Sequence, residues 1–331
     1  MLSPSKPATS KDGELATIRP QRVVLLTGSR GFTGYYVRQA LQAAGYRVVG
    51  LVRDDPVGSD EIAGSLTDAA RLREVVAKVQ PTHVVHLASV LDAGSDRARE
   101  FDIDVNGTRN VLDCCLAAGV GHITVTSSGA AYGYHPDNPA WIDEDRPLRG
   151  NPEFAYSDHK RRIEEMLADY RSRHPQLRQL VFRPGTILGA TTKNLITDLF
   201  RAKRMLAIRG SDSPFVFIWD EDVVSAIEHG LRRDLSGIYN MAGDGALTVR
   251  EIAAILGKPV RTLPAGLVKA VLWCGRRLGI GRYGPEQVNF LRYRPVLSNR
   301  RLKEEFGYRP RKTSEETFRH YVEHARARGE L

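Results

Sequence analysis

Cysteine is scarce in this chain, and no long hydrophobic run is present. The 331 residues include three cysteines, Cys114, Cys115 and Cys274. So few thiols exclude a disulfide-stabilised scaffold and predict a reducing, cytoplasmic location. No uninterrupted apolar run reaches the ~18 residues of a membrane span, and the best candidate, residues 263–280, contains basic side chains. The sequence therefore predicts a surface helix there and no integral membrane segment.

Acidic residues are outnumbered, since 48 Lys and Arg against 39 Asp and Glu give a formal charge of +9. Basic residues crowd the C-terminal third, but acidic residues are interspersed among them, so we expect a solvated face, with an anion-binding rim as the alternative. No recognition motif accompanies the charge, and no nucleic-acid partner is expected. Residues 1–21 lack the apolar core of a signal peptide and are predicted to form a flexible leader.

The histidines and cysteines follow no metal-binding pattern. There is no His-Glu-x-x-His sequence and no Cys/His cluster, so no metal ion is expected. The Gly-x-Ser-x-Gly sequence is also missing, which argues against an α/β-hydrolase.

Short apolar runs alternate with helix-like segments from Arg22 onward. Continuous apolar strands separated by helices predict a parallel sheet buried on both faces. The repeated strand–helix–strand units predict a doubly wound α/β fold of the Rossmann type. The expected strands are residues 22–27, 46–52, 83–87, 122–126 and 180–183, and the expected helices are residues 32–44, 67–79 and 97–118.

A glycine-rich turn, Thr-Gly-Ser-Arg-Gly-Phe-Thr-Gly, occupies residues 27–34 between the first strand and the first helix. Gly28 allows a tight turn, Gly31 lets the backbone approach a pyrophosphate, and Gly34 lets the helix pack close to the strand. The free N–H groups of the helix N-terminus favour an anion at this place. The sequence therefore predicts a dinucleotide cofactor.

The end of the second strand bears on which dinucleotide binds. An acid normally stands there to bind the ribose hydroxyls of NAD, but here Val52 is followed by Arg53. Arg53, and Arg30 within the glycine turn, can pair with a 2′-phosphate. We therefore expect NADP(H), with NAD(H) as the alternative if Asp54 or Asp55 binds the ribose.

The strand pattern loosens after Pro184, which predicts a second domain. Residues 22–185 are expected to form the dinucleotide-binding domain, with 213–240 returning to it. Residues 186–212 and 241–331 are expected to form a smaller, helix-rich substrate-binding domain, with a helix over 191–210.

A tyrosine and a lysine four residues apart, Tyr156 and Lys160, share one helical face. An ammonium group beside a phenol favours the phenolate, which brings the pKa of the tyrosine towards neutrality. Such a tyrosine can exchange a proton with a carbinol oxygen while a hydride moves to or from a nicotinamide. Ser128 is expected to hold the substrate oxygen. These residues predict an oxidoreductase acting on a small-molecule substrate.

Together these segments resemble the extended short-chain dehydrogenase/reductases, often labelled the NAD-dependent epimerase/dehydratase family. Beyond the glycine turn and the Tyr156–Lys160 pair, the resemblance rests on the segments at residues 86–89, 126–133, 183–189 and 302–310. Counting back four residues from Tyr132, as in family members, selects Ser128 over Ser127 as the catalytic serine.

The resemblance implies a set of binding residues and a homodimer. Tyr132 is expected to line the substrate site, with packing under its loop as an equal alternative, and Arg292 or Arg294 to bind a diphosphate. The dimer is expected through the helices at 97–118 and 154–174. The implied cofactor-binding residues are Gly28, Arg30, Gly31, Phe32, Gly34, Arg53, Ser65, Leu66, Leu87, Ala88, Ser89, Tyr156, Lys160, Pro184, Thr186 and Ile187.

Three positions depart from the family pattern. Asp104 replaces an Asn that supports the active-site lysine, so either Asp104 or nearby Asn106 is expected to take that role. Ser65 stands near the place of an Asp that meets the adenine, and Asn299 replaces an Asp in the closing segment. None of these changes removes the proton-transfer pair.

Three functions fit these residues. The first is hydride transfer between NADP(H) and a hydrophobic carbonyl or alcohol substrate, which Arg53 and the 183–187 turn favour. The alternative is a nucleotide-sugar epimerase or dehydratase with tightly bound NAD, which the basic tail favours. The third is a non-catalytic, dinucleotide-sensing protein, against which the presence of both Tyr156 and Lys160 argues.

Overall fold

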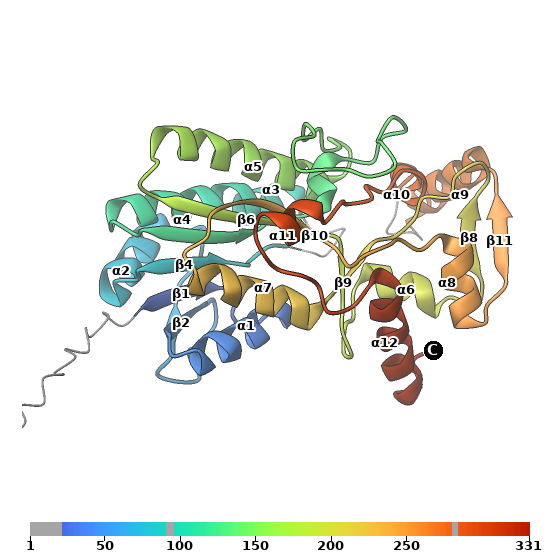
Figure 1. Ribbon diagram of the computed structural model, residues 1–331. Helices are drawn as coiled ribbons and strands as arrows, with labels where there is room; N and C mark the ends of the chain where they lie inside the picture. The colour runs from blue at the N-terminus through green and yellow to red at the C-terminus, as the bar shows by residue number, and fades with distance from the viewer. Residues whose placement is uncertain (1–21, 91–95, 280–283) are drawn as a thin grey trace, which may run out of the picture.

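A parallel sheet with strand order β10-β6-β5-β4-β1-β2-β3 forms the centre of the computed structural model, which describes residues 22–90, 96–279 and 284–331 (Figure 1). The predicted leader lies outside these ranges. The order confirms the doubly wound α/β fold. The seven strands are β1 (Val23–Thr27), β2 (Arg47–Val52), β3 (Glu61–Ala63), β4 (His83–His86), β5 (His122–Thr126), β6 (Arg178–Pro184) and β10 (Gly237–Met241).

Helices cover both faces of this sheet (Figure 1). Alternate residues of each strand point to opposite faces, so Leu25 packs with one layer, whereas Val24 and Leu26 pack with the other. The first layer contains α2 (Ala69–Val79), α4 (Gly107–Ala117) and α5 (Ala155–Arg173). The second contains α1 (Phe32–Ala43), α7 (Asp220–Arg232) and α11 (Arg300–Glu304).

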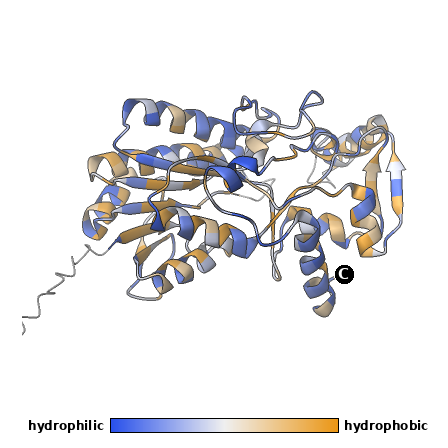
Figure 2. Ribbon diagram, viewed as in Figure 1, coloured by the Kyte–Doolittle hydropathy of each residue, from blue (hydrophilic) through white to orange (hydrophobic). Residues whose placement is uncertain are grey.

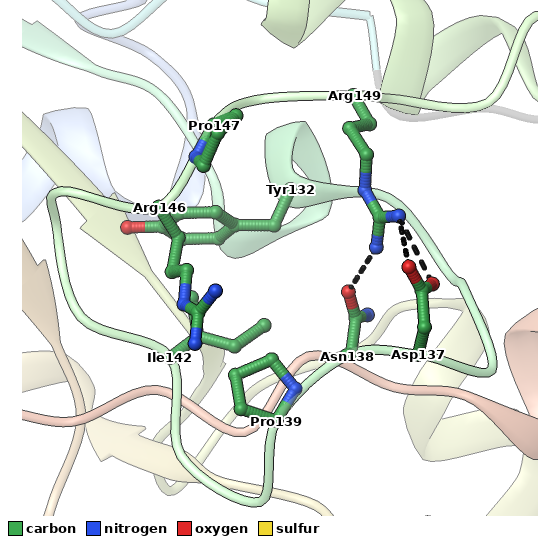
Figure 3. A pocket seen from close by; sticks show the side chains of 8 residues that line it. All are labelled: Tyr132, Asp137, Asn138, Pro139, Ile142, Arg146, Pro147 and Arg149. Carbon is green, nitrogen blue, oxygen red and sulfur yellow. Dashed lines mark hydrogen bonds and ion pairs between the residues drawn. The ribbon is translucent and has the colours of Figure 1, made fainter.

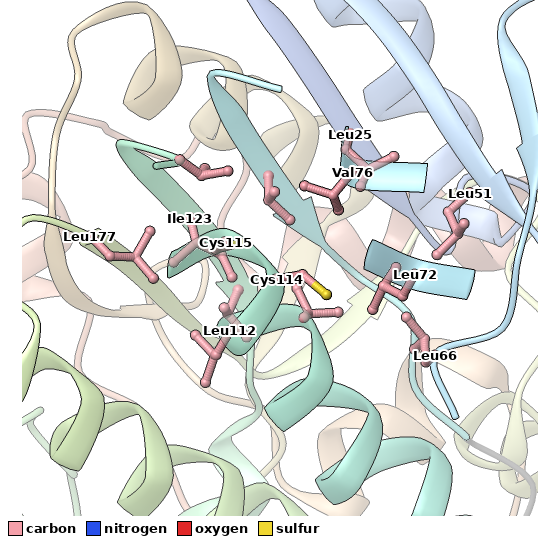
Figure 4. Packing of buried hydrophobic residues seen from close by; sticks show 14 of the residues in the cluster. Leu25, Leu51, Leu66, Leu72, Val76, Leu112, Cys114, Cys115, Ile123 and Leu177 are labelled. Carbon is pink, nitrogen blue, oxygen red and sulfur yellow. The ribbon is translucent and has the colours of Figure 1, made fainter. Parts of the chain in front are cut away.

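The two adjacent cysteines belong to the first layer. Cys114 and Cys115 lie on α4 and pack among aliphatic side chains such as Leu112, Ile123 and Leu177 (Figure 4). Both are buried, at 3% and 0% exposed. They therefore act as small core residues, whereas Cys274 is exposed.

The helix expected over residues 97–118 is present, but one turn in it is π-helical. It runs through α3 (Arg97–Phe101), a π-helical turn η1 (Asp102–Asn106) and then α4. Such π-helical turns are frequent at functional sites. This turn contains Asp104, one of the positions that depart from the family pattern.

A second lobe holds its own core of aromatic residues. Phe217 stacks on Phe318 with ring centroids 5.3 Å apart, and Phe200 packs edge-on against Phe318. The lobe contains the parallel pairs β7–β9 and β8–β11. Its elements are β7 (Thr186–Leu188), α6 (Leu195–Arg201), β8 (Met205–Ile208), β9 (Phe217–Trp219), α8 (Val249–Leu256), β11 (Val260–Leu263), α9 (Ala265–Arg277), α10 (Gln287–Arg292) and α12 (Ser314–Ala327).

The single helix expected over residues 191–210 is wrong. The Asn194 side chain accepts bonds from the N–H groups of Ile196 and Thr197 and so begins α6 there. The helix ends at Arg201, and β8 follows because its apolar residues pair with β11, more than fifty residues further along. Within 213–240, α7 and β10 join the central layers, whereas β9 pairs with β7.

The hydropathy of the residues follows this arrangement (Figure 2). The strands of the central sheet consist largely of hydrophobic residues, whereas α5 and α12 contain many hydrophilic residues. None of the helices in the described ranges has the length and hydrophobicity needed to cross a membrane.

A buried ion pair joins the sheet to the first helical layer. Arg183 of β6 binds both carboxylate oxygens of Glu164 on α5, with its shortest contact at 2.6 Å, and the two side chains are 5% and 3% exposed. Arg183 also donates to the Tyr132 hydroxyl, and Ser127 donates to Glu164. Tyr132 belongs to the 3₁₀ turn η2 (Gly129–Tyr132). The pair therefore fixes the loop that carries Ser128.

Removing one member of this pair is expected to destabilise the fold strongly. Glu164→Ala leaves the Arg183 guanidinium buried without its partner, which costs about 3–5 kcal/mol of unfolding free energy. Urea denaturation measures the loss. The double variant Glu164→Leu with Arg183→Met is expected to lose less than Glu164→Ala alone.

The matched control is Asp169→Ala, which breaks an exposed pair with Arg173 on the same helix and is expected to leave the urea midpoint nearly unchanged. Equal midpoints for Glu164→Ala and Asp169→Ala would contradict the role of the buried pair.

Candidate active site

A large cleft of about 1090 Å³ lies at the carboxyl ends of the strands, between the sheet and the second lobe. Ligands of doubly wound folds bind at this edge of the sheet. The cleft lining includes thirteen of the predicted site residues: Gly28, Gly31, Phe32, Gly34, Leu87, Ala88, Ser89, Ser128, Tyr156, Pro184, Thr186, Ile187 and Arg294.

The glycine turn is closely packed at two positions. Gly28 has a φ of +70°, and a Cβ there would lie 2.8 Å from the backbone nitrogen of Ala88. A Cβ at Gly34 would lie 2.0 Å from the Gly28 carbonyl oxygen. Side chains at these places would fill the space between β1, β4 and the start of α1. The geometry fits the predicted cradle for a pyrophosphate.

Tyr156 and Lys160 lie one turn apart near the start of α5. The Lys160 Nζ is 5.6 Å from the centre of the Tyr156 ring and donates a 3.1 Å hydrogen bond to the Thr126 carbonyl. Tyr156 lines the cleft, whereas Lys160 is buried behind it. Ser128 lines the same cleft, and its Oγ accepts a bond from the Ala130 N–H. The structure thus brings the three predicted catalytic residues to one site.

The start of α5 is held against the serine loop. Ser157 donates a 2.7 Å hydrogen bond to the Ala130 carbonyl, and both residues are buried. This bond links the helix that carries Tyr156 to the turn that follows Ser128. Rigid support of this kind keeps proton-transfer groups in position.

Asp104 lies buried behind the tyrosine–lysine pair. One carboxylate oxygen accepts a 2.9 Å bond from the Val90 N–H, and the other lies 3.3 Å from the Nδ1 of His159. Asn106 instead donates to Asp102 at the exposed side of the helix. Of the two, Asp104 is thus the buried residue, and its partners are the Val90 N–H and His159.

His86 completes this buried group. Its two ring nitrogens bond to the Thr27 and Thr108 hydroxyls. Burial, followed by the nearby Lys160 ammonium, lowers the pKa of His86 to about 4, while Asp104 acts in the opposite direction. His86 is therefore neutral at pH 7, and the charges of Lys160 and Asp104 act on the same buried region.

The two arginines expected near a 2′-phosphate differ in their surroundings. Arg30 makes a 2.6 Å ion pair with Glu61 and also bonds to the Asp55 carbonyl. The bond from Arg30 lowers the pKa of the Glu61 carboxyl to about 2, so the pair is charged at neutral pH. Arg53 is exposed and has no hydrogen bond or ion pair to the described residues. Glu61 thus neutralises one of the two proposed phosphate ligands.

Arg294 is buried in the cleft wall between two aromatic rings. Its guanidinium carbon lies 3.6 Å from the centre of Phe215 and 4.9 Å from that of Phe290. It donates to the Ser213 carbonyl at 2.7 Å, while its Nε has no partner and no carboxylate within the described ranges pairs with it. Burial lowers the pKa of Arg294 to about 9, which leaves it cationic at neutral pH. This cation is suited to binding an anionic ligand.

Four further predicted binding residues lie outside the cleft lining. Arg292 packs over Tyr293, and Ser65 bonds to Thr67. Leu66 is buried in the core. Their roles stay predictions.

Tyr132 is the fourth of these residues. It is 1% exposed, and its hydroxyl donates to Asn240 and accepts from Arg183. It borders a separate cavity of about 180 Å³, where Arg149 pairs with Asp137 and Asn138 (Figure 3). These contacts agree with the alternative expectation, in which Tyr132 packs under its loop and does not line the substrate site.

The structure also adds residues that the sequence did not single out. Tyr134 lines the cleft, and its ring lies 5.2 Å from Phe290 and 5.6 Å from Phe154. Tyr134 stands two residues after Tyr132, but the hydropathy pattern gave no sign that it faces the cleft. Glu61 and Glu164 bond to arginines distant in sequence, so no local pattern reveals them.

The cradle, the tyrosine–lysine pair and the cleft fit a nicotinamide dinucleotide. At Gly28 and Gly34 the backbone is packed so closely that any Cβ would clash with it, so the turn requires glycine. Ser89 has a buried hydroxyl without a partner in the described ranges, and it lines the cleft. No group of three His, Cys, Asp or Glu side chains suited to a metal ion occurs among the described residues.

Fold and site together define an extended short-chain dehydrogenase/reductase. The chain belongs to the NAD dependent epimerase/dehydratase family, whose sequence profile matches residues 24–242. The resemblance inferred from the sequence motifs is confirmed.

Relatives and solved structures agree with this assignment. An uncharacterized Mycobacterium tuberculosis protein is 25% identical over 311 residues, which cover 92% of this chain, but the chain spans only 30% of that relative's length. An N-acetyl-alpha-D-glucosaminyl-diphospho-ditrans,octacis-undecaprenol 4-epimerase of Escherichia coli O157:H7 is 28% identical over 70% of each protein. The Thermus thermophilus UDP-glucose 4-epimerase, solved with NAD, is 24% identical, with a TM-score of 0.71 over 92% of this chain and 99% of that one.

Replacing Asp104 by Asn is expected to shift the pH dependence of turnover. Loss of a buried negative charge lowers the pKa values of neighbouring groups, as the effect of Asp104 on His86 indicates. The pH profile of kcat is therefore expected to move to lower pH, by up to about one unit. An unchanged profile with a lower unfolding midpoint would mean that Asp104 is only structural.

Proposed function

We propose that the chain converts diphosphate-linked sugars, such as nucleotide sugars, by oxidising a secondary alcohol of the sugar in an epimerase or dehydratase reaction with NAD(H). The observation that carries this proposal is Arg294, a buried guanidinium without a carboxylate partner in the described residues, which lines the same cleft as Tyr156. Arginine is suited to bind a diphosphate through several charge-assisted hydrogen bonds. The name of the Escherichia coli relative, a 4-epimerase of a diphosphate-linked sugar, supports this substrate class.

The chemistry divides among the residues of the cleft. A nicotinamide dinucleotide held at the glycine turn would supply the hydride acceptor, and afterwards the hydride donor, for the substrate carbon. The Tyr156 phenolate takes the hydroxyl proton as the carbonyl forms and returns it on reduction. Lys160 places a positive charge beside the Tyr156 ring, and Ser128 binds the substrate oxygen. Gly28 and Gly34 allow the close backbone packing of the turn that would hold the pyrophosphate, and Ile187 lines the cleft.

NAD(H) is favoured over NADP(H) by the charge around the glycine turn. Glu61 neutralises Arg30 and adds a carboxylate close to where a 2′-phosphate would lie. The Thermus enzyme, solved with NAD, supports the same cofactor. Arg53 is exposed and without a partner in the described ranges, and this observation keeps a second candidate function, an NADP(H)-dependent reductase of hydrophobic carbonyl compounds.

The homodimer, the cytoplasmic location and the division into two domains stay predictions. The helices expected at the dimer interface are present as α3, η1 and α4 over Arg97–Ala117 and as α5. Both lie in the layer opposite α1 and α7.

Two substitutions test the proposed reaction. The assay follows UDP-glucose and UDP-N-acetylglucosamine with NAD by proton NMR, which detects an epimerised or dehydrated product. Tyr156→Phe is expected to lower kcat by about 10²–10⁴-fold, because the phenolate is lost, while cofactor affinity is retained. Arg294→Met is expected to raise KM by about 10–100-fold, because a charge-assisted hydrogen bond contributes ~1.5–3 kcal/mol.

The matched control is Arg292→Met, an arginine two residues away that lies outside the cleft lining and is expected to leave KM unchanged. Full turnover by Tyr156→Phe would contradict the catalytic proposal. Net consumption of NADPH with hydrophobic ketones, and no reaction of the sugar diphosphates, would establish the reductase instead.

Cofactor preference is tested by fluorescence titration with NADH and NADPH. Wild-type protein is expected to bind NADH more tightly, and Arg53→Ala to change NADH affinity little. Glu61→Gln frees Arg30 for a 2′-phosphate and is expected to strengthen NADPH binding. Tighter binding of NADPH by the wild type, lost in Arg53→Ala, would overturn the choice of NAD(H).

A further inference from the structure

The outer face of α9 exposes an unusual amount of apolar side chain. Leu267, Val271, Trp273 and Leu278 are 50%, 61%, 57% and 70% exposed. Elsewhere in the described residues, Val57 and Trp141 are exposed singly, and a less exposed group of aromatic residues, Phe32, Tyr35 and Tyr36, lies at the start of α1. A concentration of this kind marks an interaction surface.

The exposed residues form a continuous stripe along the helix. Leu267, Val271, Cys274 and Leu278 follow one another at intervals of four, three and four residues, which places them on one face. Another face of the helix is used by the fold, since Val268 packs with Ile208 and Val288. The stripe is thus additional to the packing that holds α9 in place, and Figure 2 shows hydrophobic and hydrophilic segments on this helix.

The segment that carries the stripe is basic. The 34 residues between Glu251 and Glu286 contain no acid and six basic residues. On α9, Lys269 and Arg277 are exposed and make no ion pair with described residues, whereas Arg276 pairs with Glu286 at 3.1 Å. A helix with an exposed apolar stripe, and with Trp273, Lys269 and Arg277 exposed on its other sides, has the composition of a helix that lies on an anionic lipid surface.

A second copy of the chain fits this face less well. Two copies paired through this face would bring together two segments that each contain six basic residues and no acid. In an anionic phospholipid bilayer the headgroups complement the positive charge, and the boundary with the acyl chains accepts the apolar residues. We propose that α9 docks the protein on the surface of an anionic phospholipid bilayer.

Docking would also orient the cleft. Val268, Leu272 and Arg276 of the same helix line it. A helix lying in the headgroup region would therefore place one wall of the cleft at the bilayer surface. This docking does not depend on which reaction the cleft catalyses.

Sedimentation with extruded vesicles tests the proposal. The full chain is expected to sediment with vesicles of phosphatidylcholine and phosphatidylglycerol, and at least tenfold less with phosphatidylcholine alone or in 0.5 M salt, because the charge attraction is then absent or screened. The double variant Val271→Glu with Leu278→Glu and the double variant Lys269→Glu with Arg277→Glu are each expected to bind at least tenfold more weakly.

Matched controls lie on the other lobe. Val57→Glu changes an exposed valine, and Arg73→Glu with Lys78→Glu changes two exposed cations of α2. Both are expected to bind vesicles like the wild type. Because all these positions are exposed, the unfolding midpoints are expected to stay unchanged.

A fluorophore on Cys274 gives an independent readout. Cys114 and Cys115 are buried, so an environment-sensitive thiol reagent labels Cys274 in the stripe. Its emission is expected to shift to the blue when anionic vesicles are added. Absence of vesicle binding, or equal binding by the α9 variants and the controls, would overturn the proposal. A wild-type dimer that the α9 variants convert to monomer, without any vesicle binding, would assign the face to self-association instead.

Discussion

The buried pair between Arg183 and Glu164 connects the elements that carry Ser128, Tyr156 and the 184–187 turn. Arg183 lies at the end of β6, just before the turn that borders the cleft, and Glu164 lies two turns along α5 from Tyr156. Through Ser127 and Tyr132 the same pair holds both ends of the Ser128 loop. Removing one member of a buried ion pair leaves the other charge buried without a partner, which strongly destabilises the fold. The relative positions of Ser128, Tyr156 and the 184–187 turn therefore depend on it.

Two buried cations have different surroundings at the cleft. Lys160 lies beside the Tyr156 ring, and its charge and that of Asp104 both act on buried His86. Arg294 lines the same cleft as Tyr156 and has no carboxylate partner among the described residues. In the proposed function, Lys160 serves the proton transfer and Arg294 binds the anionic substrate. Arg30, in the glycine turn, is instead paired with Glu61.

Local sequence patterns predicted the sheet, the glycine turn and the Tyr156–Lys160 pair, because each depends on residues close together in the chain. Long-range pairing was not predictable in the same way. Local sequence predicts helix over β8, because the strand depends on pairing with β11, which lies more than fifty residues away in the chain. Asp104 and His159 are 55 residues apart, and their contact leaves no local signal. Spacing alone also could not distinguish Arg294, in the cleft, from Arg292, outside its lining.

The central claim is that Tyr156 and Arg294 act on one sugar diphosphate in one cleft. A crystal structure of the protein with NAD and UDP-glucose tests it most directly. The account predicts that the diphosphate contacts the Arg294 guanidinium and that a sugar hydroxyl lies within hydrogen-bonding distance of Tyr156 and Ser128. A diphosphate bound away from Arg294, or a sugar that does not reach Tyr156, would contradict it.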